Sequence, residues 1–357
     1  MRSVRFLVVA LACLAPLGAR AEYPKLELSG NVWGQWAYDL SFAHPDSPKP
    51  GGTHRFEVTR TYLNFRARLS PSISLRVTPD LVAATGTDGN LDGSLVLRLK
   101  FAYVDFEAFP ALAVRALMQP TPYIGFSDGV WGYRVLGPDI LEHFTGIRSS
   151  DVGLGLLGAP LGNYADYQVL LSNGEGYNRQ ERIEPEAGKY KDLAARLTLA
   201  PLAGAGPWLE GLRLTLFGQY GIRERILGAR LERIRAMALA TWSGPGFTLG
   251  TGGGFSADDQ ATEGRLLRRE SFLWTSWGWV DLPLSLRAIG RLDLDVPDAA
   301  SADDPGRRSR IIAGLAYRFT DDVQVIVNWE RNDAQKPENG PLDAPRDSLF
   351  LRVAAEF

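Results

Sequence analysis

Apolar and polar residues alternate along most of this 357-residue chain. An apolar residue at every second position is typical of a β-strand whose two faces meet different environments. Sixteen such segments are bounded by turn residues. They lie at 25–40, 55–69, 72–82, 94–107, 111–118, 151–158, 164–172, 189–200, 210–220, 230–242, 246–255, 269–281, 283–294, 309–319, 322–331 and 347–357. The pattern predicts an all-β protein.

The connections between these segments alternate in length. Short turns are expected at Ser70–Ser72, Ala108–Pro110, Ala159–Asn163, Ser243–Pro245, Asp281–Pro283 and Thr320–Asp322. Long polar loops are expected at 41–54, 83–93, 119–150, 173–188, 256–268, 295–308 and 332–346. Tight turns at one end and long loops at the other are characteristic of a transmembrane β-barrel. We therefore predict a single antiparallel transmembrane barrel of about 16 strands, although 14 or 18 would also fit.

The last ten residues form an alternating strand that ends in an aromatic residue. Its apolar face carries Leu349, Leu351, Val353, Ala355 and Phe357. Such a strand resembles the closing strand of bacterial outer-membrane barrels. The resemblance implies that Phe357 belongs to the signal read by the barrel assembly machinery.

The first 21 residues have the pattern of a secretory signal. A basic start is followed by an apolar stretch at 6–14 and by Ala19–Ala21, a small-x-small cleavage site. The apolar stretch is shorter than the roughly 20 residues that a membrane-spanning helix needs. Cys13, the single cysteine, lies inside this segment, and a lipoprotein signal is the alternative reading. We expect residues 22–357 to form the mature barrel, in contact with lipid in the outer membrane of a Gram-negative bacterium.

Arginines recur on the face opposite the apolar one. A lipid-facing arginine near the membrane midplane costs about 2–4 kcal/mol, so these side chains are expected to line the lumen. Arg98 and Lys100 are ambiguous because Phe101–Asp105 suggests a bulge. The predicted pore-lining residues are Arg60, Arg66, Arg68, Arg76, Arg115, Arg213, Arg233, Arg235, Arg287, Arg291, Arg318 and Arg352.

Two interpretations of these arginines stay open at this stage. They can occupy and hydrate the interior of a wide barrel while bridging carboxylates across strands. Alternatively, they can form a basic ladder that guides anions, because a guanidinium keeps its charge and presents several donors. The sequence does not choose between the two.

Many of the aromatic residues lie near the ends of the predicted strands. They include Trp33, Trp36, Tyr38, Trp242, Trp274, Trp277, Trp279 and Trp329. Interfacial aromatic girdles explain this placement. An ordinary aromatic core is the alternative.

The third long connection, Gln119–Ser150, is far longer than an ordinary loop and rich in apolar residues. We expect it to fold into the barrel, bury its apolar side chains against the wall and narrow the pore. Packing on the outer rim or at a subunit contact is the alternative. The residues expected to face the channel are Asp128, Arg134, Asp139, Glu142, His143 and Arg148.

The charge balance argues against a nucleic-acid-binding protein. The chain has 39 basic and 41 acidic residues. Removing the signal takes away three arginines, which leaves 36 basic residues and a net charge of −5. Arginine outnumbers lysine by 33 to 6.

The sequence offers no convincing catalytic constellation. His143 beside Glu142 is the one plausible general base, but no serine motif accompanies it. Asp258-Asp259 and Asp303-Asp304 could bind calcium at loop tips, although solvated turn acids are the simpler interpretation. We expect no catalytic residue, metal or cofactor. An outer-membrane enzyme, such as a phospholipase or protease, and a structural or adhesin barrel remain the alternatives.

Four segments resemble, in order and spacing, the phosphate-selective porin O and P family. They are RFEVTRTYLNFRARL at Arg55–Leu69, FAYVDFE at Phe101–Glu107, LAVRALMQPTPY at Leu112–Tyr123 and YADYQVLLSNG at Tyr164–Gly174. The resemblance implies a sixteen-stranded homotrimeric channel with an inward-folded third loop. The family's lysine before the proline aligned with Pro122 has no counterpart here. Together these observations predict a water-filled porin for small hydrophilic solutes, including anions such as phosphate.

Overall fold

The structure is a computed structural model. It describes residues 23–42, 52–83, 94–174, 176–177, 190–226, 229–262, 265–297, 306–334 and 346–357. The predicted signal segment and the Asp303-Asp304 pair lie outside these residues.

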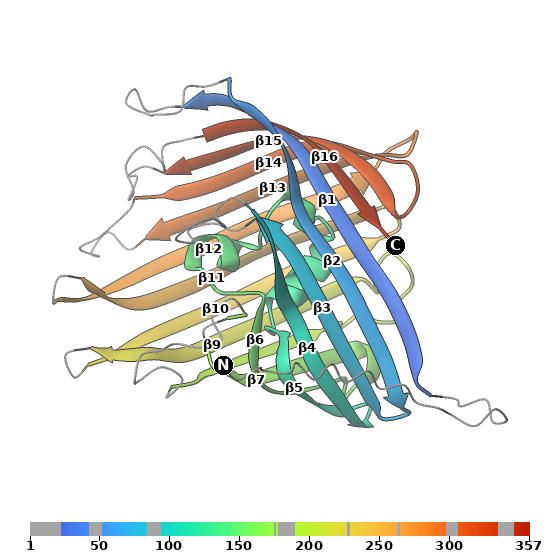
Figure 1. Ribbon diagram of the computed structural model, residues 1–357, viewed down its shortest axis with the longest axis vertical. Helices are drawn as coiled ribbons and strands as arrows, with labels where there is room; N and C mark the ends of the chain where they lie inside the picture. Colours follow the sequence, from blue (N-terminus) through green and yellow to red (C-terminus); the bar gives the residue numbers. More distant parts are fainter. Residues whose placement is uncertain are drawn as a thin grey trace, which may run out of the picture.

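The described residues form sixteen antiparallel strands in one closed barrel (Figure 1). Each strand pairs with its neighbours in sequence, and β1 pairs with β16 from Asn31↔Glu356 to Phe42↔Arg346. This confirms the predicted fold. The strands are β1 Lys25–Phe42, β2 His54–Ser70, β3 Ile73–Ala83, β4 Leu95–Phe109, β5 Leu112–Pro120, β6 Ser150–Gly158, β7 Ala165–Ser172, β8 Asp192–Leu199, β9 Leu212–Ile226, β10 Ala229–Gly244, β11 Phe247–Thr262, β12 Arg265–Asp281, β13 Leu286–Pro297, β14 Arg308–Arg318, β15 Val323–Ala334 and β16 Arg346–Glu356.

The predicted long loop at 256–268 is wrong. β11 continues to Thr262 and pairs there with Arg265 of β12, so only residues 263–264 separate the two strands. Polar residues occupy both faces of this extension, which hides the period-two signal that identifies a strand. Asp258 and Asp259 consequently lie on β11 rather than at a loop tip, and they pair with Arg235 and Arg268.

The outer surface of the barrel is a continuous apolar band. Leu214 and Leu216 point outward on β9, and Phe65 and Leu69 do so on β2. A closed barrel satisfies the backbone donors and acceptors of its strands, which is the condition for a sheet in a lipid bilayer. Exposed apolar side chains around such a closed sheet place the protein in the outer membrane. No helix in the described part of the chain is both long and apolar enough to cross a membrane.

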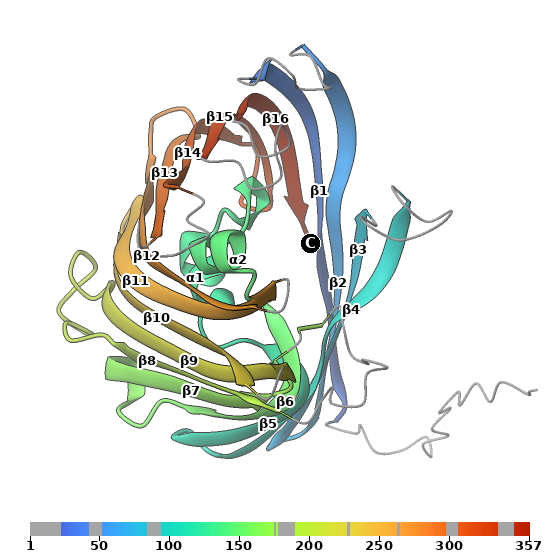
Figure 2. The ribbon, with the colours of Figure 1, turned by 90° about the vertical axis from the view of Figure 1, so that its left-hand side faces the viewer.

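The connection between β5 and β6, residues 121–149, folds into the barrel as predicted (Figure 2). We call this connection L3. It contains α1 (Ile124–Trp131), a 3-10 turn η1 (Arg134–Leu136) and α2 (Ile140–Thr145). Three further 3-10 residues at Gly162–Tyr164 form η2 in a short turn.

L3 is held against the inner wall by an apolar core. Trp131 contacts Trp277 of β12 with ring centroids 5.1 Å apart, and Tyr123 contacts Phe217 of β9 at 5.2 Å. Trp33 and Trp277 belong to this buried cluster, so the girdle interpretation is wrong for both. L3 needs an apolar patch on the lumen wall, and aromatic residues supply it.

Candidate channel constriction

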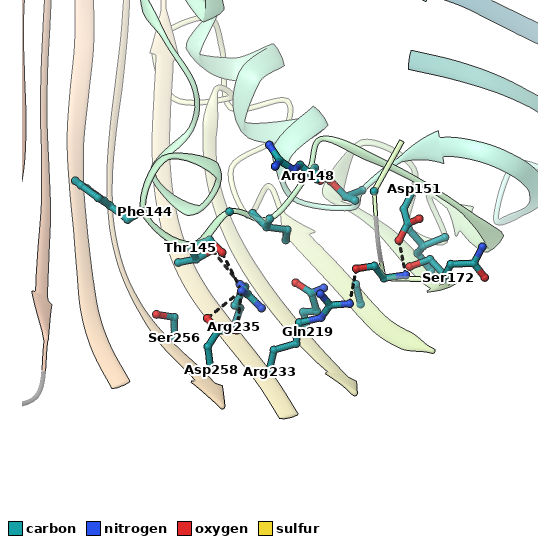
Figure 3. Close-up of a pocket in the computed structure, with 18 of the residues that line it drawn as sticks. Phe144, Thr145, Arg148, Asp151, Ser172, Gln219, Arg233, Arg235, Ser256 and Asp258 are labelled. Atoms are coloured by element: carbon teal, nitrogen blue, oxygen red, sulfur yellow. Dashed lines mark hydrogen bonds and ion pairs between the residues drawn. The ribbon is translucent and has the colours of Figure 1, made fainter. Parts of the chain in front are cut away.

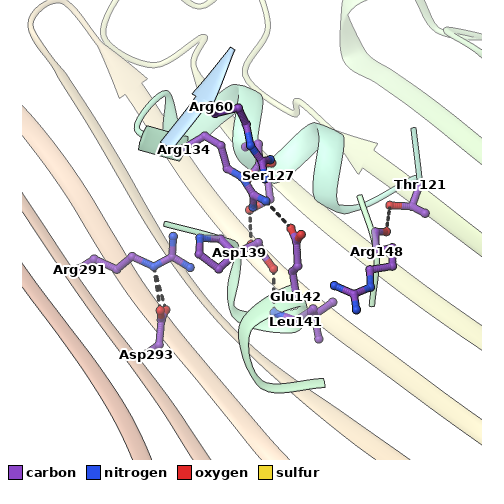
Figure 4. A network of polar contacts seen from close by, with 12 residues as sticks. Arg60, Thr121, Ser127, Arg134, Asp139, Leu141, Glu142, Arg148, Arg291 and Asp293 are labelled. Carbon is purple, nitrogen blue, oxygen red and sulfur yellow. Dashed lines mark hydrogen bonds and ion pairs between the residues drawn. The ribbon is translucent and has the colours of Figure 1, made fainter. Parts of the chain in front are cut away.

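L3 carries an ion-pair network around Arg134 (Figure 4). Arg134 Nη2 lies 2.7 Å from Glu142 Oε2, and its Nη1 lies 3.5 Å from Asp128 Oδ1. The three side chains are largely buried, yet each keeps some contact with the lumen. L3 therefore presents two acids and one arginine as a preorganised group.

Asp139 fixes the turn that leads into α2. Its Oδ1 accepts a hydrogen bond from the Leu141 backbone N–H at 2.9 Å, which satisfies one of the free donors at the start of the helix. Its Oδ2 accepts a 2.6 Å hydrogen bond from Ser127 Oγ on α1. Asp139 is almost fully buried, so it joins the two helices of L3 instead of facing the channel as predicted.

Burial changes the protonation equilibria in L3. It raises the pKa of Asp128 to about 6, although Arg134 opposes the change. Burial also raises the pKa of Asp139, despite the opposing charge of Arg291. Burial lowers the pKa of Arg134, but Asp128 and Glu142 outweigh this effect and raise it overall. Arg134 is permanently charged, whereas Asp128 titrates near neutral pH.

His143 and Arg148 are the exposed members of the predicted set. The His143 ring meets Phe144 edge-to-face at 4.6 Å. Its side chain keeps an exposed surface, but the surrounding barrel removes water, and this desolvation together with Arg310 lowers the pKa of His143. The imidazole is therefore neutral near pH 7. No carboxylate among the described residues pairs with Arg148.

A second polar cluster lies on the wall formed by β2, β3 and β4. Asp80 is fully buried between Arg60, whose Nε is 3.7 Å away, and Arg98, whose Nη2 is 3.2 Å away. Lys100 Nζ donates to Tyr62 Oη at 2.5 Å. Tyr62 belongs to the same buried cluster as the apolar residues of L3, so this wall and the loop form one unit.

The predicted bulge on β4 is present, and it explains why the residues before it could not be assigned to a face. The register between β3 and β4 shifts where Pro79 pairs with Leu99 and Thr78 with Phe101, which leaves Lys100 unpaired. Lys100 and Tyr103 are both buried although three positions separate them. A bulge changes the face on which later residues point.

Five arginines of the wall hold L3 by its backbone. Each donates from its guanidinium to a carbonyl oxygen of the loop. Arg196 binds Pro122 at 3.0 Å, Arg310 binds Pro138 at 2.6 Å, Arg308 binds Phe144 at 3.2 Å, Arg235 binds Thr145 at 3.0 Å, and Arg352 binds Val135. These contacts run along most of L3, so the loop is fixed in place along its length.

The same five arginines are also ion-paired. Arg310 illustrates the arrangement: its Nε lies 2.8 Å from Asp293 Oδ2, and Arg291 Nε lies 2.9 Å from the same oxygen. Thr275 Oγ1 donates to Asp293 Oδ1 at 2.6 Å. The other acidic partners are Asp166 for Arg196, Asp258 for Arg235, Asp295 for Arg308 and Glu330 for Arg352. Buried charges are tolerated when they are paired and hydrogen-bonded in this way.

Three of these L3-holding arginines, Arg196, Arg308 and Arg310, were absent from the predicted set. Arg310 stands an even number of positions from Arg318, inside the predicted strand 309–319, so its inward position could have been read from the sequence. Arg196 lies in the predicted strand 189–200 on the same face as buried Asp192 and Ala194. The carbonyl contacts leave no signal in the sequence, because any residue supplies a carbonyl.

The other predicted pore arginines also have polar or charged neighbours. Arg233, near the long connections, lies 2.8 Å from Asp192. Near the short turns, the pairs are Arg66–Glu27 at 3.0 Å, Arg68–Glu107 at 3.1 Å, Arg76–Asn64 at 2.7 Å, Arg115–Asp105 at 2.6 Å, Arg287–Asp281 at 2.6 Å and Arg318–Asp281 at 3.4 Å. Arg213 has no carboxylate partner among the described residues. Bridging of carboxylates, the first of the two interpretations, thus describes most of these side chains.

Solved outer-membrane proteins share this architecture. DcaP, an outer membrane channel of Acinetobacter baumannii, superposes with a TM-score of 0.63 at 11% identity over 94% of this chain and 97% of its own. The anion-selective porin from Comamonas acidovorans gives 0.66 at 11% identity over 94% and 100%. A trimer form of OmpT, an outer membrane protein of Vibrio cholerae, gives 0.59 at 11% identity over 94% and 99%. These similarities show a common fold.

No protein-family model and no curated protein matches the sequence. The phosphate-selective porin family is therefore not confirmed, and the resemblance to it stays a prediction. The fold is the porin fold, with a helical loop fastened inside the barrel.

Proposed function

We propose that this protein is an outer-membrane porin through which small hydrophilic solutes diffuse, with a preference for anions. The observation that carries the proposal is L3, a charged helical loop fastened inside a closed barrel by arginines of the wall. A loop fixed in this way narrows the lumen to a defined polar constriction. A barrel of sixteen strands is wide enough to leave an aqueous path.

The preference for anions rests on which charges lack partners. Arg148 on L3 and Arg213 on β9 have no carboxylate partner among the described residues. Lys100 donates to a tyrosine rather than to an acid. Cations of this kind along a pore favour anions electrostatically. Phosphate is one anion of the proposed class, since guanidinium groups match its oxygens.

Planar-bilayer recording tests the proposal. Purified protein should insert with stepwise conductance, and the reversal potential in a salt gradient should indicate that anions are more permeable than cations. The preference should be largest at low ionic strength, where screening is weakest. A folded, heat-modifiable barrel without conductance would contradict the porin and favour an enzyme or a plugged barrel.

The assembly of the protein is part of the same proposal. We infer a homotrimer from the family resemblance, and one structural neighbour is described in a trimer form. Light scattering of detergent-extracted protein should give three times the mass of one chain. A monomer at all protein concentrations would contradict the homotrimer but not the proposed channel.

A further inference from the structure

A separate polar cavity lies beside the constriction, at the end of the barrel that carries the long connections. It has a volume of about 360 Å³ and lies between residues 144–151, which are the end of L3 and the start of β6, and the wall formed by β7–β12 (Figure 3). Ligand cavities typically measure roughly 300–1,000 Å³. The size therefore suits a small organic molecule better than an inorganic ion alone.

The lining of this cavity is rich in positive charge. Five arginines and two aspartates contribute to it, namely Arg148, Arg233, Arg235, Arg269, Arg308, Asp151 and Asp258. Asp192 and Asp295 pair with Arg233 and Arg308 behind this lining, which leaves one arginine in excess of the acids. An excess of one sign in a concave site focuses the field and raises the local concentration of the opposite ion. The cavity therefore attracts anions.

Two of these arginines have hydrogen-bond donors left over. Arg235 is only 5% exposed and lies 2.9 Å from Asp258, yet its Nη1 is buried without a partner among the described residues. Arg233 lies 2.8 Å from Asp192, and its Nε is likewise buried without a partner there. Buried donors are normally satisfied, because leaving one unpaired costs about 1–3 kcal/mol. Their place on the cavity wall provides donors for a bound oxyanion.

Apolar side chains lie beside this basic surface. Ile147 and Phe144 line the cavity from L3, and Leu170 lines it from β7. Leu170 is almost fully buried, so its neighbours hold this part of the cavity wall in place. A ligand with an anionic head and a short apolar body would contact both kinds of surface.

We propose that this cavity binds a small organic anion from the outer side of the constriction, with its carboxylate or phosphate group at Arg233 and Arg235. Arg148 lies on the L3 side of the same cavity and adds a positive charge without a carboxylate partner among the described residues. Phe144, Ile147 and Leu170 contact the organic body. The inference rests on the proposed anion preference and specifies the class of solute.

Calorimetric titration of the folded protein in detergent tests the site directly. Phenyl phosphate combines the two features of the proposed ligand, whereas inorganic phosphate and phenol each carry one. We expect phenyl phosphate to bind more tightly than either. Arg233→Gln should weaken phenyl phosphate binding by about tenfold or more, as expected for a lost hydrogen bond to a charged group.

Arg318→Gln is the matched control, because Arg318 is also paired with an aspartate in the lumen but lies outside the cavity. It should leave phenyl phosphate binding unchanged. Arg233 donates no hydrogen bond to L3 in the described structure, and Gln219 Nε2 still donates to Asp192 at 2.7 Å, so Arg233→Gln should fold with reduced stability; heat-modifiable migration verifies this. If Arg233→Gln does not fold, Arg148→Gln replaces it as the cavity variant and should weaken phenyl phosphate binding. The Arg148 side chain is exposed and has no carboxylate partner among the described residues, so its loss should not affect folding.

Three results would overturn the site: binding that survives both cavity variants, an equal loss in Arg318→Gln, or inorganic phosphate binding as tightly as phenyl phosphate. Bilayer recording separates this from the proposed function. An anion-preferring channel without phenyl phosphate binding contradicts only the cavity. A barrel that binds phenyl phosphate through Arg233 but does not conduct contradicts only the porin.

Discussion

At the scale of single residues, five wall arginines perform two tasks at once, and these tasks favour arginine over lysine. Arg310 contacts a carboxylate of the wall and a carbonyl of L3 at the same time. A guanidinium presents five donors in a rigid plane, whereas an ammonium is a point charge on a flexible stem. Bridging between barrel and loop thus explains the use of arginine at these five positions.

Arg310→Gln tests this bridging role. The substitution removes one of two arginines from buried Asp293 and one anchor from L3. Breaking a buried ion pair typically costs about 3–5 kcal/mol. We expect the temperature at which the folded band converts to the unfolded band on gels to fall clearly. Arg318→Gln breaks a more exposed ion pair and should lower this conversion temperature much less. Equal decreases in the two variants would show that Arg310 stabilises the barrel no more than a surface ion pair does.

Asp128 should make the channel sensitive to pH. Its pKa of about 6 means that the carboxyl loses its charge as the pH falls through that value. One negative charge then disappears from L3, while Arg134 stays charged because Asp128 and Glu142 raise its pKa above an already high value. The preference for anions should therefore rise as the pH is lowered from about 7.5 to about 5, by about threefold at low salt.

The control for this prediction is Asp128→Asn, which is neutral at every pH. Reversal potentials should show it to be as anion-selective at the higher pH as the unchanged protein is at the lower one. Its selectivity should not change across this range. A step of the same size in Asp128→Asn would assign the pH effect to another group.

The alternation of side chains between the two faces of a strand explains which residue positions the sequence could predict. On β2, β10 and β13 the predicted arginines of each strand share one face, because the register shifts of β2 and β10 fall outside the stretches that carry them. The alternation left Lys100 unassigned, because a bulge changes the face there, and it assigned Trp33 and Trp277 to the membrane interface. Their burial depends on L3, a segment distant in sequence that supplies the other half of the core.

At the scale of elements, L3 was recognisable because a long connection rich in aromatic residues cannot stay in solvent. The detailed path of the loop was not predictable. It depends on five contacts to its backbone carbonyls and on the cap at Asp139, none of which has a sequence signature of its own. The end of β11 was missed because polar residues on both of its faces hide the period-two signal. These residues still pair as a strand beyond the apolar band.

Deleting Gly125–Glu142 should increase single-channel conductance. The deletion removes α1, η1 and the first half of α2, and with them the charged group around Arg134. The barrel wall keeps its own strand pairing, so the variant should fold and run as a heat-modifiable band. Unchanged conductance in a folded deletion variant would show that L3 does not limit the pore.

At the scale of the whole molecule, the barrel depends on the seam between its first and last strands. Phe357 N–H donates to Gly30 O at 3.0 Å, and Gly30 N–H donates to Phe357 O at 2.9 Å. Gly30 is needed there, because a Cβ at this position would lie 2.6 Å from the Phe357 ring and 2.5 Å from the Tyr62 carbonyl oxygen. The terminal residue therefore closes the hydrogen-bonded ladder of the sheet.

Phe357 should matter more for assembly in the cell than for the stability of the finished barrel. The ring is 61% exposed on the outer surface, and Phe357→Ala retains both backbone hydrogen bonds with Gly30, so refolding into lipid vesicles should be almost unchanged. If the ring is read by the assembly machinery, the same variant should be strongly depleted from the outer membrane, while Phe357→Tyr should accumulate normally. Equal losses in cells and in vesicles would instead give the ring a structural role at the seam, since vesicles contain no machinery to read it.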